Sequence, residues 1–309
     1  MPTPECVSVV IPTKDGADTL GELLARLFEQ KRRFDLDVVV IDSGSRDATL
    51  EIAARHPLRL ERIAPREFDH GETRNRGIAM TRGDPIVLLT QDAIPADESL
   101  LENIARPFDD VCVAGVYGRQ IPRPDCDVVR RRQLEGWLTG RLEPARVELG
   151  GTSLDALSPF ERYERCVFDN VCSAVRRSVW ERIPFRRAAF GEDVAWGRAV
   201  LEAGFAIAYE PSAAVVHSHR RPVREEYRRE RLSHRVLYEL FGLAAVPRRR
   251  DVARGVLWHL RNEVPYAWRH APRGVERWRQ LARMAGLALA VPLGQHLGVA
   301  DARRARSDP

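Results

Sequence analysis

The sequence predicts an α/β fold in which a mostly parallel sheet has helices on both faces and is followed by a basic α-helical segment. Short runs of apolar, β-branched residues alternate with amphipathic helical patterns along most of the chain. These runs are continuous, as in strands that are buried on both sides of a parallel sheet. The final part of the chain changes to arginine-rich helical patterns. A length of 309 residues with 44% hydrophobic content is ample for a real core.

The first two repeats show the pattern most clearly. Residues 7–11 form a predicted strand, followed by a loop at 12–16 and a helix with leucines at helical spacing. A second predicted strand, 38–41, ends in Asp42 and leads into another helix. The later predicted elements are strand 58–63, helix 72–81, strand 86–89, helix 98–105, strands 111–117 and 171–175, helix 194–203 and strand 206–209. The irregular segment from about 120 to 168 predicts a long excursion over the mouth of an active site.

Carboxylates follow three of the predicted strands: Asp15, Asp42 and Asp92. Residues at the carboxyl ends of parallel strands meet at one cleft, so their separation in sequence is no obstacle. Asp42 could accept a hydrogen bond from a uracil or thymine ring, and Asp92 could hold a divalent cation against a diphosphate. Taken singly, each is also a common turn or cap residue. The first loop lacks Gly-x-Gly-x-x-Gly, which argues against a dinucleotide-dependent dehydrogenase.

Five short motifs occur in the order found in a known enzyme family. They are Ser8–Thr13, Asp42–Ser45, Thr73–Gly77, Thr90–Ala93 and Gly191–Asp193. Together they resemble the family 2 glycosyltransferases of GT-A fold, a Rossmann-like architecture, and most closely the bacterial rhamnosyltransferase-like members. The resemblance covers about residues 7–220 and leaves out the basic segment. We therefore expect a nucleotide-sugar glycosyltransferase domain over 1–220 and a basic helical segment over 221–309.

The resemblance implies roles for the strand-end residues in binding the donor and a cation. Pro12, Thr13 and Asp42 would cradle the nucleobase and ribose, and Arg74 would lie near the diphosphate. Gln91 and Asp92 would belong to the same nucleotide-sugar site. Asp92 matches the last residue of the family's Asp-x-Asp metal motif, whereas Thr90 and Gln91 replace acidic residues. A single carboxylate holds Mg²⁺ or Mn²⁺ weakly, so a second ligand is expected, His217 in preference to His219.

Asp193 matches the family's catalytic base. It follows Gly191 at the start of a predicted helix, where the helix dipole favours an ionised carboxylate. Glu192 would bind the acceptor or structure the turn, and Trp196 would stack on a sugar or belong to the core. Arg119 is a further candidate for the sugar site. The weaker candidates for it are His70, Gln120, Asn170 and Ser173.

Charge divides the chain unevenly. Residues 220–309 hold 20 Arg, no Lys and 9 acidic residues, a net charge of +11, against +5 for the whole chain. Arg- and Trp-rich amphipathic helices suit the surface of an anionic membrane, or they pack on the catalytic body with a solvated arginine face. The segment has no recognisable nucleic-acid-binding module, so we expect no nucleic acid partner.

Five scattered cysteines and the lack of a charged leader predict a cytoplasmic protein without a signal peptide, and the Arg- and Trp-rich helices suggest peripheral attachment at the inner face of the cell membrane.

The resulting prediction is an inverting glycosyltransferase that moves a sugar to a hydroxyl of a saccharide or lipid-linked glycan acceptor in cell-envelope polysaccharide synthesis. The expected donor is dTDP-rhamnose, and the expected cofactor is Mg²⁺ or Mn²⁺. The alternative is a catalytically silent relative that acts as a membrane- or partner-binding scaffold, which Gln91 and the basic segment suggest.

Overall fold

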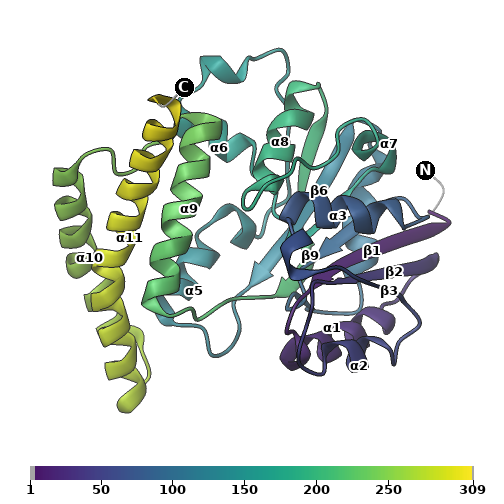
Figure 1. The fold of residues 1–309 in the computed structure, drawn as a ribbon, viewed down its shortest axis with the longest axis horizontal. Helices are drawn as coiled ribbons and strands as arrows, with labels where there is room; N and C mark the ends of the chain where they lie inside the picture. Colours follow the sequence, from purple (N-terminus) through teal and green to yellow (C-terminus); the bar gives the residue numbers. More distant parts are fainter. Residues whose placement is uncertain (1–3, 308–309) are drawn as a thin grey trace. The chain divides into compact units, whose positions relative to one another are not determined.

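One half of the central sheet consists of four parallel strands. The computed structural model describes residues 4–307. Its strands β1 (Cys6–Thr13), β2 (Asp35–Asp42), β3 (Arg59–Arg62) and β4 (Ile86–Leu89) lie in the order β3-β2-β1-β4 and are all parallel (Figure 1). The apolar runs of β1, β2 and β4 are buried, as their continuous pattern predicts, while β3 is a mostly exposed edge strand.

The other half of the sheet is mixed. β8 (Cys172–Val175) runs antiparallel to β4 on one side and to β6 (Val113–Ile121) on the other. β9 (Ala206–Val216) runs parallel to β6, and the short strands β5 (Ile94–Pro95) and β7 (Ala145–Val147) pair antiparallel with β9. The predicted α/β class is confirmed. Because β8 is reversed, the residues just before it lie at the same sheet edge as those just after β4 and β6.

Helices cover both faces of the sheet. α1 (Ala17–Phe28), below the strands in Figure 1, and α4 (Leu100–Ala105) bury their leucines in the main core. α3 (His70–Ala79) and α8 (Glu192–Glu202) lie on the opposite face. α3 approaches so closely that a Cβ on Gly77 would lie 2.4 Å from Val10 Cγ1. The short helices are α2 (Thr49–Ala53) and α7 (Arg177–Trp180).

The chain forms two compact units. The first runs up to Arg123 and includes Leu134–Ala156 and Arg165–Ser218, so it holds the whole sheet. The second comprises Pro124–Gln133, Leu157–Glu164 and the chain from His219 onward. It therefore takes in two earlier segments besides the basic one. The functional boundary at residue 220 stays a prediction.

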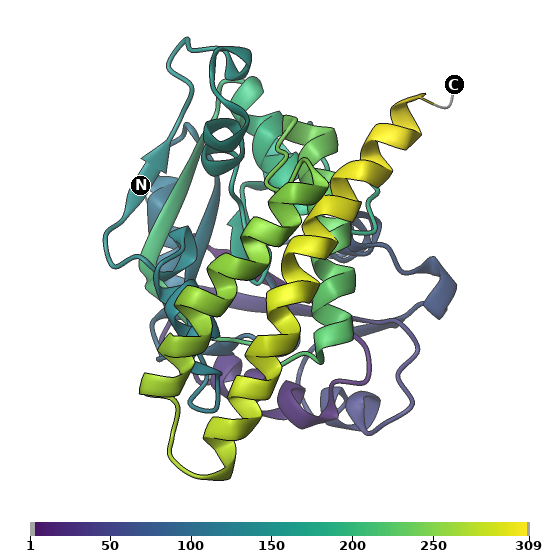
Figure 2. The ribbon, with the colours of Figure 1, turned by 90° about the vertical axis from the view of Figure 1, so that its left-hand side faces the viewer.

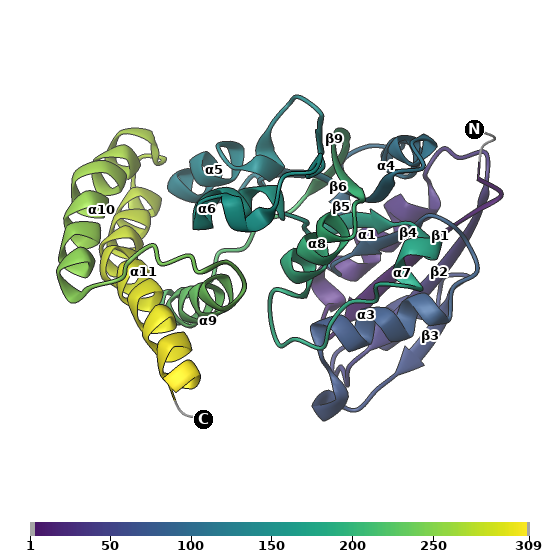
Figure 3. The same cartoon turned by 90° about the horizontal axis from the view of Figure 1, so that it is seen from above.

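Three long helices lie side by side in the second unit (Figures 2 and 3). They are α9 (Val223–Phe241), α10 (Arg249–His270) and α11 (Val275–Ser307). α11 packs closely on α9 because it presents glycine at the contact: a Cβ on Gly298 would lie 2.2 Å from the Arg231 carbonyl oxygen. Among residues 4–307, no helix has the length and apolar character that a membrane crossing requires.

The segment that looked irregular in sequence contains local structure. It includes α5 (Val128–Glu135), β7 and α6 (Pro159–Arg165), joined by turns and 3₁₀ helices. These short elements carry mixed charged and apolar residues without a clear period, which explains why the sequence pattern did not reveal them. That the segment covers an active-site mouth stays a prediction.

Candidate active site

The first two strands end in a hydrogen-bonded turn around Asp42. Its side chain is fully buried, and Oδ1 accepts hydrogen bonds from the backbone N–H groups of Gly44 (3.0 Å) and Ser45 (3.1 Å). The Thr13 hydroxyl lies 3.5 Å from Asp42 Oδ2, and Pro12 and Thr13 pair with the end of β2. Asp42 therefore closes the turn, as its residue type predicts. Its role in binding a nucleobase stays a prediction.

Gln91 joins the loop after β4 to the loop after β1. Its Oε1 accepts from the Lys14 N–H at 2.8 Å, and its Nε2 donates to the Lys14 carbonyl at 3.0 Å. A Cβ on Gly16 would lie 2.6 Å from the same Oε1, so the two loops are packed as well as bonded. The residue that replaces an acid in the family's metal motif thus holds together two loops of the predicted donor site.

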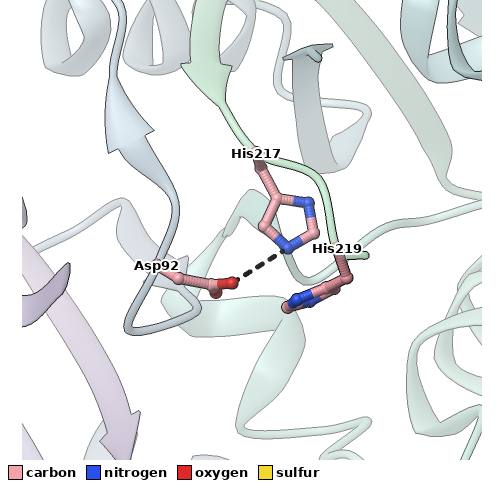
Figure 4. A group of neighbouring side chains, drawn as sticks. All are labelled: Asp92, His217 and His219. Atoms are coloured by element: carbon pink, nitrogen blue, oxygen red, sulfur yellow. Dashed lines mark ion pairs between the residues drawn. The ribbon is translucent and has the colours of Figure 1, made fainter. Parts of the chain in front are cut away.

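A group of three metal-ligand side chains lies at the same edge of the sheet. One ligand atom from each of Asp92, His217 and His219 falls within 4.8 Å of the others (Figure 4). Asp92 Oδ2 lies 3.5 Å from His217 Nε2. His217 follows the last residue of β9, whose end pairs with β5 just after Asp92, and this pairing brings the two residues together.

Hydrogen bonds fix the orientation of the His217 ring. Gln120 donates from Nε2 to Asp169 Oδ2 at 2.7 Å, which leaves its Oε1 to accept from His217 Nδ1 at 2.9 Å. In the neutral imidazole the proton therefore sits on Nδ1, and the lone pair of Nε2 faces the Asp92 carboxylate. A lone pair and a carboxylate turned toward one another suit a divalent cation between them, and a hydrogen bond behind the ligating histidine is typical of metal sites.

Asp193 occupies the second position of α8. The preceding turn needs glycine, because Gly191 has a φ of 77°, in the left-handed region. Asp193 Oδ1 accepts from the Val194 backbone N–H at 2.8 Å. The Gly191 turn thus places this carboxylate in the first turn of α8, as the sequence predicts.

Glu192 points into a buried network. Its Oε1 forms an ion pair with Arg74 Nη1 at 2.9 Å and accepts from Asn170 Nδ2 at 3.1 Å. The Ser173 hydroxyl donates to Asn170 Oδ1 at 2.8 Å. Glu192 and Arg74 are 4% and 5% exposed, so both are turned away from solvent. Glu192 therefore structures the turn. Binding of a diphosphate by Arg74 stays a prediction, and the burial of Arg74 and its ion pair with Glu192 argue against it.

The protonation of Asp193 differs from the expectation. Burial first, and then the negative charges of Glu192 and Asp169, raise the pKa of Asp193 to about 8, although the Val194 N–H and Arg74 oppose the rise. A helix dipole contributes about 0.3–1 kcal/mol, less than the 1.4 kcal/mol of one pKa unit. Burial therefore outweighs the dipole, and the expectation of an easily ionised carboxylate was wrong for the protein without ligands.

Trp196 and Arg119 are the two remaining candidates, and both have buried side-chain atoms. Trp196 is 1% exposed, packs between the rings of Phe168 and Phe185, and donates from Nε1 to the Ile183 carbonyl at 2.8 Å. It is a core residue, the second of its two predicted roles. Arg119, on β6, has a buried Nε without a hydrogen-bond partner among the described residues. Its place in a sugar site stays a prediction.

Asp169 is the residue that the sequence reasoning missed. It binds Gln120, which orients His217, and its charge acts on Asp193, so it links the metal-ligand group to Asp193. Asp169 precedes β8, and residues before an antiparallel strand lie at the same edge as residues after its parallel neighbours. The only signal in the sequence was an acidic residue just before an apolar strand, and the structure shows that this strand is reversed.

Comparison with known proteins gives the family. The model of "Glycosyl transferase family 2" matches residues 8–183. The chain is 29% identical over 230 residues to the O-antigen chain rhamnosyltransferase RfbN of Salmonella typhimurium, covering 72% of this chain and 69% of that protein. It is 30% identical over 227 residues to the O-antigen chain rhamnosyltransferase WbaN of Salmonella anatum, with the same coverage.

Solved structures agree on the fold. The mannosyltransferase PcManGT from Pyrobaculum calidifontis, in complex with GDP-Man and Mn²⁺, superposes with a TM-score of 0.53 at 20% identity, covering 99% of this chain and 76% of that chain. Glucosyl-3-phosphoglycerate synthase from Mycobacterium tuberculosis, with Mn²⁺, UDP-glucose and glycerol 3-phosphate, gives 0.52 at 20% identity, covering 77% and 81%. The resemblance to rhamnosyltransferase-like members is confirmed, and the chain belongs to glycosyl transferase family 2 as a glycosyltransferase.

Proposed function

We propose that this enzyme transfers rhamnose from dTDP-rhamnose to a hydroxyl of a saccharide or lipid-linked acceptor in cell-envelope polysaccharide synthesis, with inversion at the anomeric carbon. The observation that carries the proposal is the link between the metal-ligand residues and Asp193 at one edge of the sheet. Asp169 binds Gln120 behind the metal-ligand residue His217, and it acts electrostatically on Asp193. Two relatives named as O-antigen chain rhamnosyltransferases support the choice of sugar and pathway.

The residues divide the reaction between them. Asp92 and His217 would hold a divalent cation, Mg²⁺ or Mn²⁺, which neutralises charge on the departing nucleoside diphosphate. Asp193, aimed from the start of α8, accepts the proton of the acceptor hydroxyl as that oxygen attacks the anomeric carbon. Arg74 and Glu192 hold the α8 turn in place from behind. Pro12, Thr13, Asp42, Gln91 and Arg119 remain the proposed donor-site residues.

The test is a mass-spectrometric search for product with dTDP-, UDP- and GDP-sugars over a panel of saccharide and lipid-linked acceptors. We expect product with dTDP-rhamnose, and a higher melting temperature with dTDP and Mn²⁺ because a ligand that binds the folded state stabilises it. Product from another donor would overturn the sugar assignment. Nucleotide binding without any turnover would favour the scaffold alternative, which the enzymatic relatives do not favour.

The second unit is proposed to attach the enzyme to the inner, cytoplasmic face of the cell membrane. Trp268 and Trp278, at the turn between α10 and α11, are 47% and 64% exposed, and their rings lie 5.6 Å apart. Residues 248–283 hold ten Arg and three acidic residues. Exposed tryptophan among arginines is typical of segments that bind anionic lipid surfaces.

Flotation with anionic and neutral vesicles tests this attachment. Trp268→Ser with Trp278→Ser should reduce binding of the full chain to anionic vesicles, whereas Phe160→Ser, at an aromatic residue that is 50% exposed outside this turn, should not. Equal flotation of the natural protein, the double tryptophan variant and Phe160→Ser would rule out attachment through the turn between α10 and α11.

A further inference from the structure

A cavity of about 830 Å³ lies within the helical unit. It is lined by the start of α5 and by α9, α10 and α11, and none of its lining residues is among those assigned above to glycosyl transfer. One part of its wall is apolar and consists of Val246, Trp258, Met284, Leu287, Val291 and Pro292. Volumes of about 300–1,000 Å³ are typical of small-molecule sites. The cavity is therefore large enough for a ligand.

The carboxylates in the wall all have basic partners. Asp127 accepts from Arg283 Nε at 2.7 Å, and Glu226 lies 3.8 Å from Nη2 of the same arginine. Glu230 pairs with His234 at 3.4 Å. Glu263, which is 4% exposed, pairs with His259 and accepts from Gln133 Nε2 at 2.7 Å. Each of these carboxylates thus already has a basic side chain within 4.0 Å in the unit.

Two arginines in the same wall have no such partner. Among the described residues, the side chains of Arg130 and Arg132 form no ion pair and no hydrogen bond, although the Arg132 guanidinium lies over the Tyr266 ring at 3.9 Å. Arg130 is half-buried, and burial lowers the pKa of its guanidinium, while Glu226 and Glu230 oppose this and Arg229 adds to it. A partly buried guanidinium without a contacting ion-pair or hydrogen-bond partner is costly, and a guanidinium binds phosphate or carboxylate through paired hydrogen bonds.

We propose that this cavity binds an amphipathic anion, whose phosphate or carboxylate head pairs with Arg130 and whose apolar chain lies against Trp258 and the α11 side of the wall. The arrangement is the one such a ligand requires: guanidinium groups without a contacting carboxylate on α5, and apolar side chains on α10 and α11. The ligand is either a lipid of the bilayer or a soluble amphiphile of the same chemistry. The proposal does not depend on the identity of the donor sugar.

Isothermal titration of the full chain with three probes tests the proposal. Dodecyl phosphate, used below its micellar concentration, has both parts of the ligand; dodecyl maltoside keeps the chain with a neutral head, and inorganic phosphate is the head alone. We expect saturable one-to-one binding of dodecyl phosphate, at least tenfold tighter than either other probe. Equal affinity for the maltoside would overturn the anionic head, and equal affinity for inorganic phosphate would overturn the apolar chain.

Variants locate the site. Arg130→Gln should weaken dodecyl phosphate binding at least tenfold, and Arg130→Lys should weaken it less, because lysine keeps the charge but loses the paired geometry. The matched control is Arg254→Gln on α10, outside the cavity and 72% exposed, which should bind as the natural protein does. The melting temperature of Arg130→Gln should not fall, since the substitution removes an unpaired charge. If Arg130→Gln fails to fold, Arg130→Lys takes its place in the test. Unchanged affinity of Arg130→Lys for dodecyl phosphate would then overturn the role of Arg130.

Flotation with phosphatidylglycerol vesicles distinguishes the two sources of the ligand. Loss of vesicle binding in Arg130→Gln would assign the head group to a bilayer lipid. Unchanged flotation, together with lost dodecyl phosphate binding, would assign it to a soluble amphiphile.

Discussion

Two groups of side chains at the same sheet edge handle negative charge in different ways. The base-side cluster consists of Arg74, Asn170, Glu192 and Asp193, and the cation-side cluster of Asp92, Gln120, Asp169 and His217. In the base-side cluster the chain supplies its own cation, because Arg74 pairs with Glu192, and burial raises the pKa of the neighbouring Asp193. In the cation-side cluster an imidazole lone pair faces a carboxylate.

The base-side cluster pairs its buried charges within the chain, whereas we propose that the cation-side cluster takes a bound ion. The stability of the base-side cluster should follow from the chain alone. That of the cation-side cluster should depend on a bound ion. Five measurements separate these statements.

The largest effect is expected from Asp193→Asn. An amide accepts no proton, and a positioned general base contributes about 10²–10⁴-fold to a rate. Transfer should fall by that factor, while the stabilisation by dTDP and Mn²⁺ is retained, as measured by product formation and thermal shift. Trp180→Phe, remote from both clusters in the short helix α7, is the control. Transfer at an unchanged rate would show that Asp193 is not the base.

The next largest effect concerns the buried ion pair. Arg74→Met leaves Glu192 buried without its cation, which should lower the free energy of unfolding by about 3–5 kcal/mol, measured by urea denaturation. The double variant Arg74→Met, Glu192→Leu should regain much of this loss, because an apolar pair often replaces a buried ion pair at little cost. Additive losses in the double variant would mean that the two charges do not depend on each other.

A smaller effect is expected on the cation side. Gln120→Leu removes the hydrogen bond that orients His217, and loss of such a partner typically weakens metal binding about 10–100-fold. Titration with Mn²⁺ measures this affinity, and unfolding in EDTA should show little change. Gln280→Leu, which removes a buried glutamine of the second unit, is the control. If Mn²⁺ binds Gln120→Leu as tightly as the natural protein, His217 does not depend on this orientation.

The smallest effect is the pH dependence that the raised pKa of Asp193 implies. Since folding raises this pKa, the native state holds the proton more tightly than the unfolded chain, whose Asp pKa is about 3.9. The associated stability is present below that value and is lost as the pH rises through about 8. Without metal, Asp193→Asn should therefore exceed the natural protein in melting temperature at pH 9 and lose this advantage near pH 4.

Asp169→Asn tests the raised pKa of Asp193 through the pH dependence of enzyme activity. Removing this negative charge should lower the pKa of Asp193 and move the acid limb of the rate profile to lower pH, because the base works ionised. An unmoved limb would show that Asp169 does not act on the base.

Several features of the site could be predicted from the sequence because they depend on local patterns. The apolar runs predict β1, β2 and β4, and the loops after them carry Asp42 and Asp92. Gly191 before an acidic pair predicts the start of α8. Such features depend on residues within a few positions of one another, so periodicity and turn chemistry suffice.

Other features depended on partners far along the chain. The reversal of β8 brings Asp169 to the active edge, and no local pattern in the strand records its direction. Arg74 meets Glu192 only through the packing of α3 and α8 on one sheet face. Trp196 looked equally suited to a sugar or to the core until Phe168 and Phe185 enclosed it.

By itself the sequence determined the order of the elements, the catalytic motifs and the arginine-rich helices. Only the tertiary structure decided which charges are paired, which proton His217 carries and why the Asp193 carboxylate resists ionisation. The physical reason is that the pKa, the hydrogen-bond roles and the ion pairs of a group follow from its burial and its neighbours in space, and folding sets both.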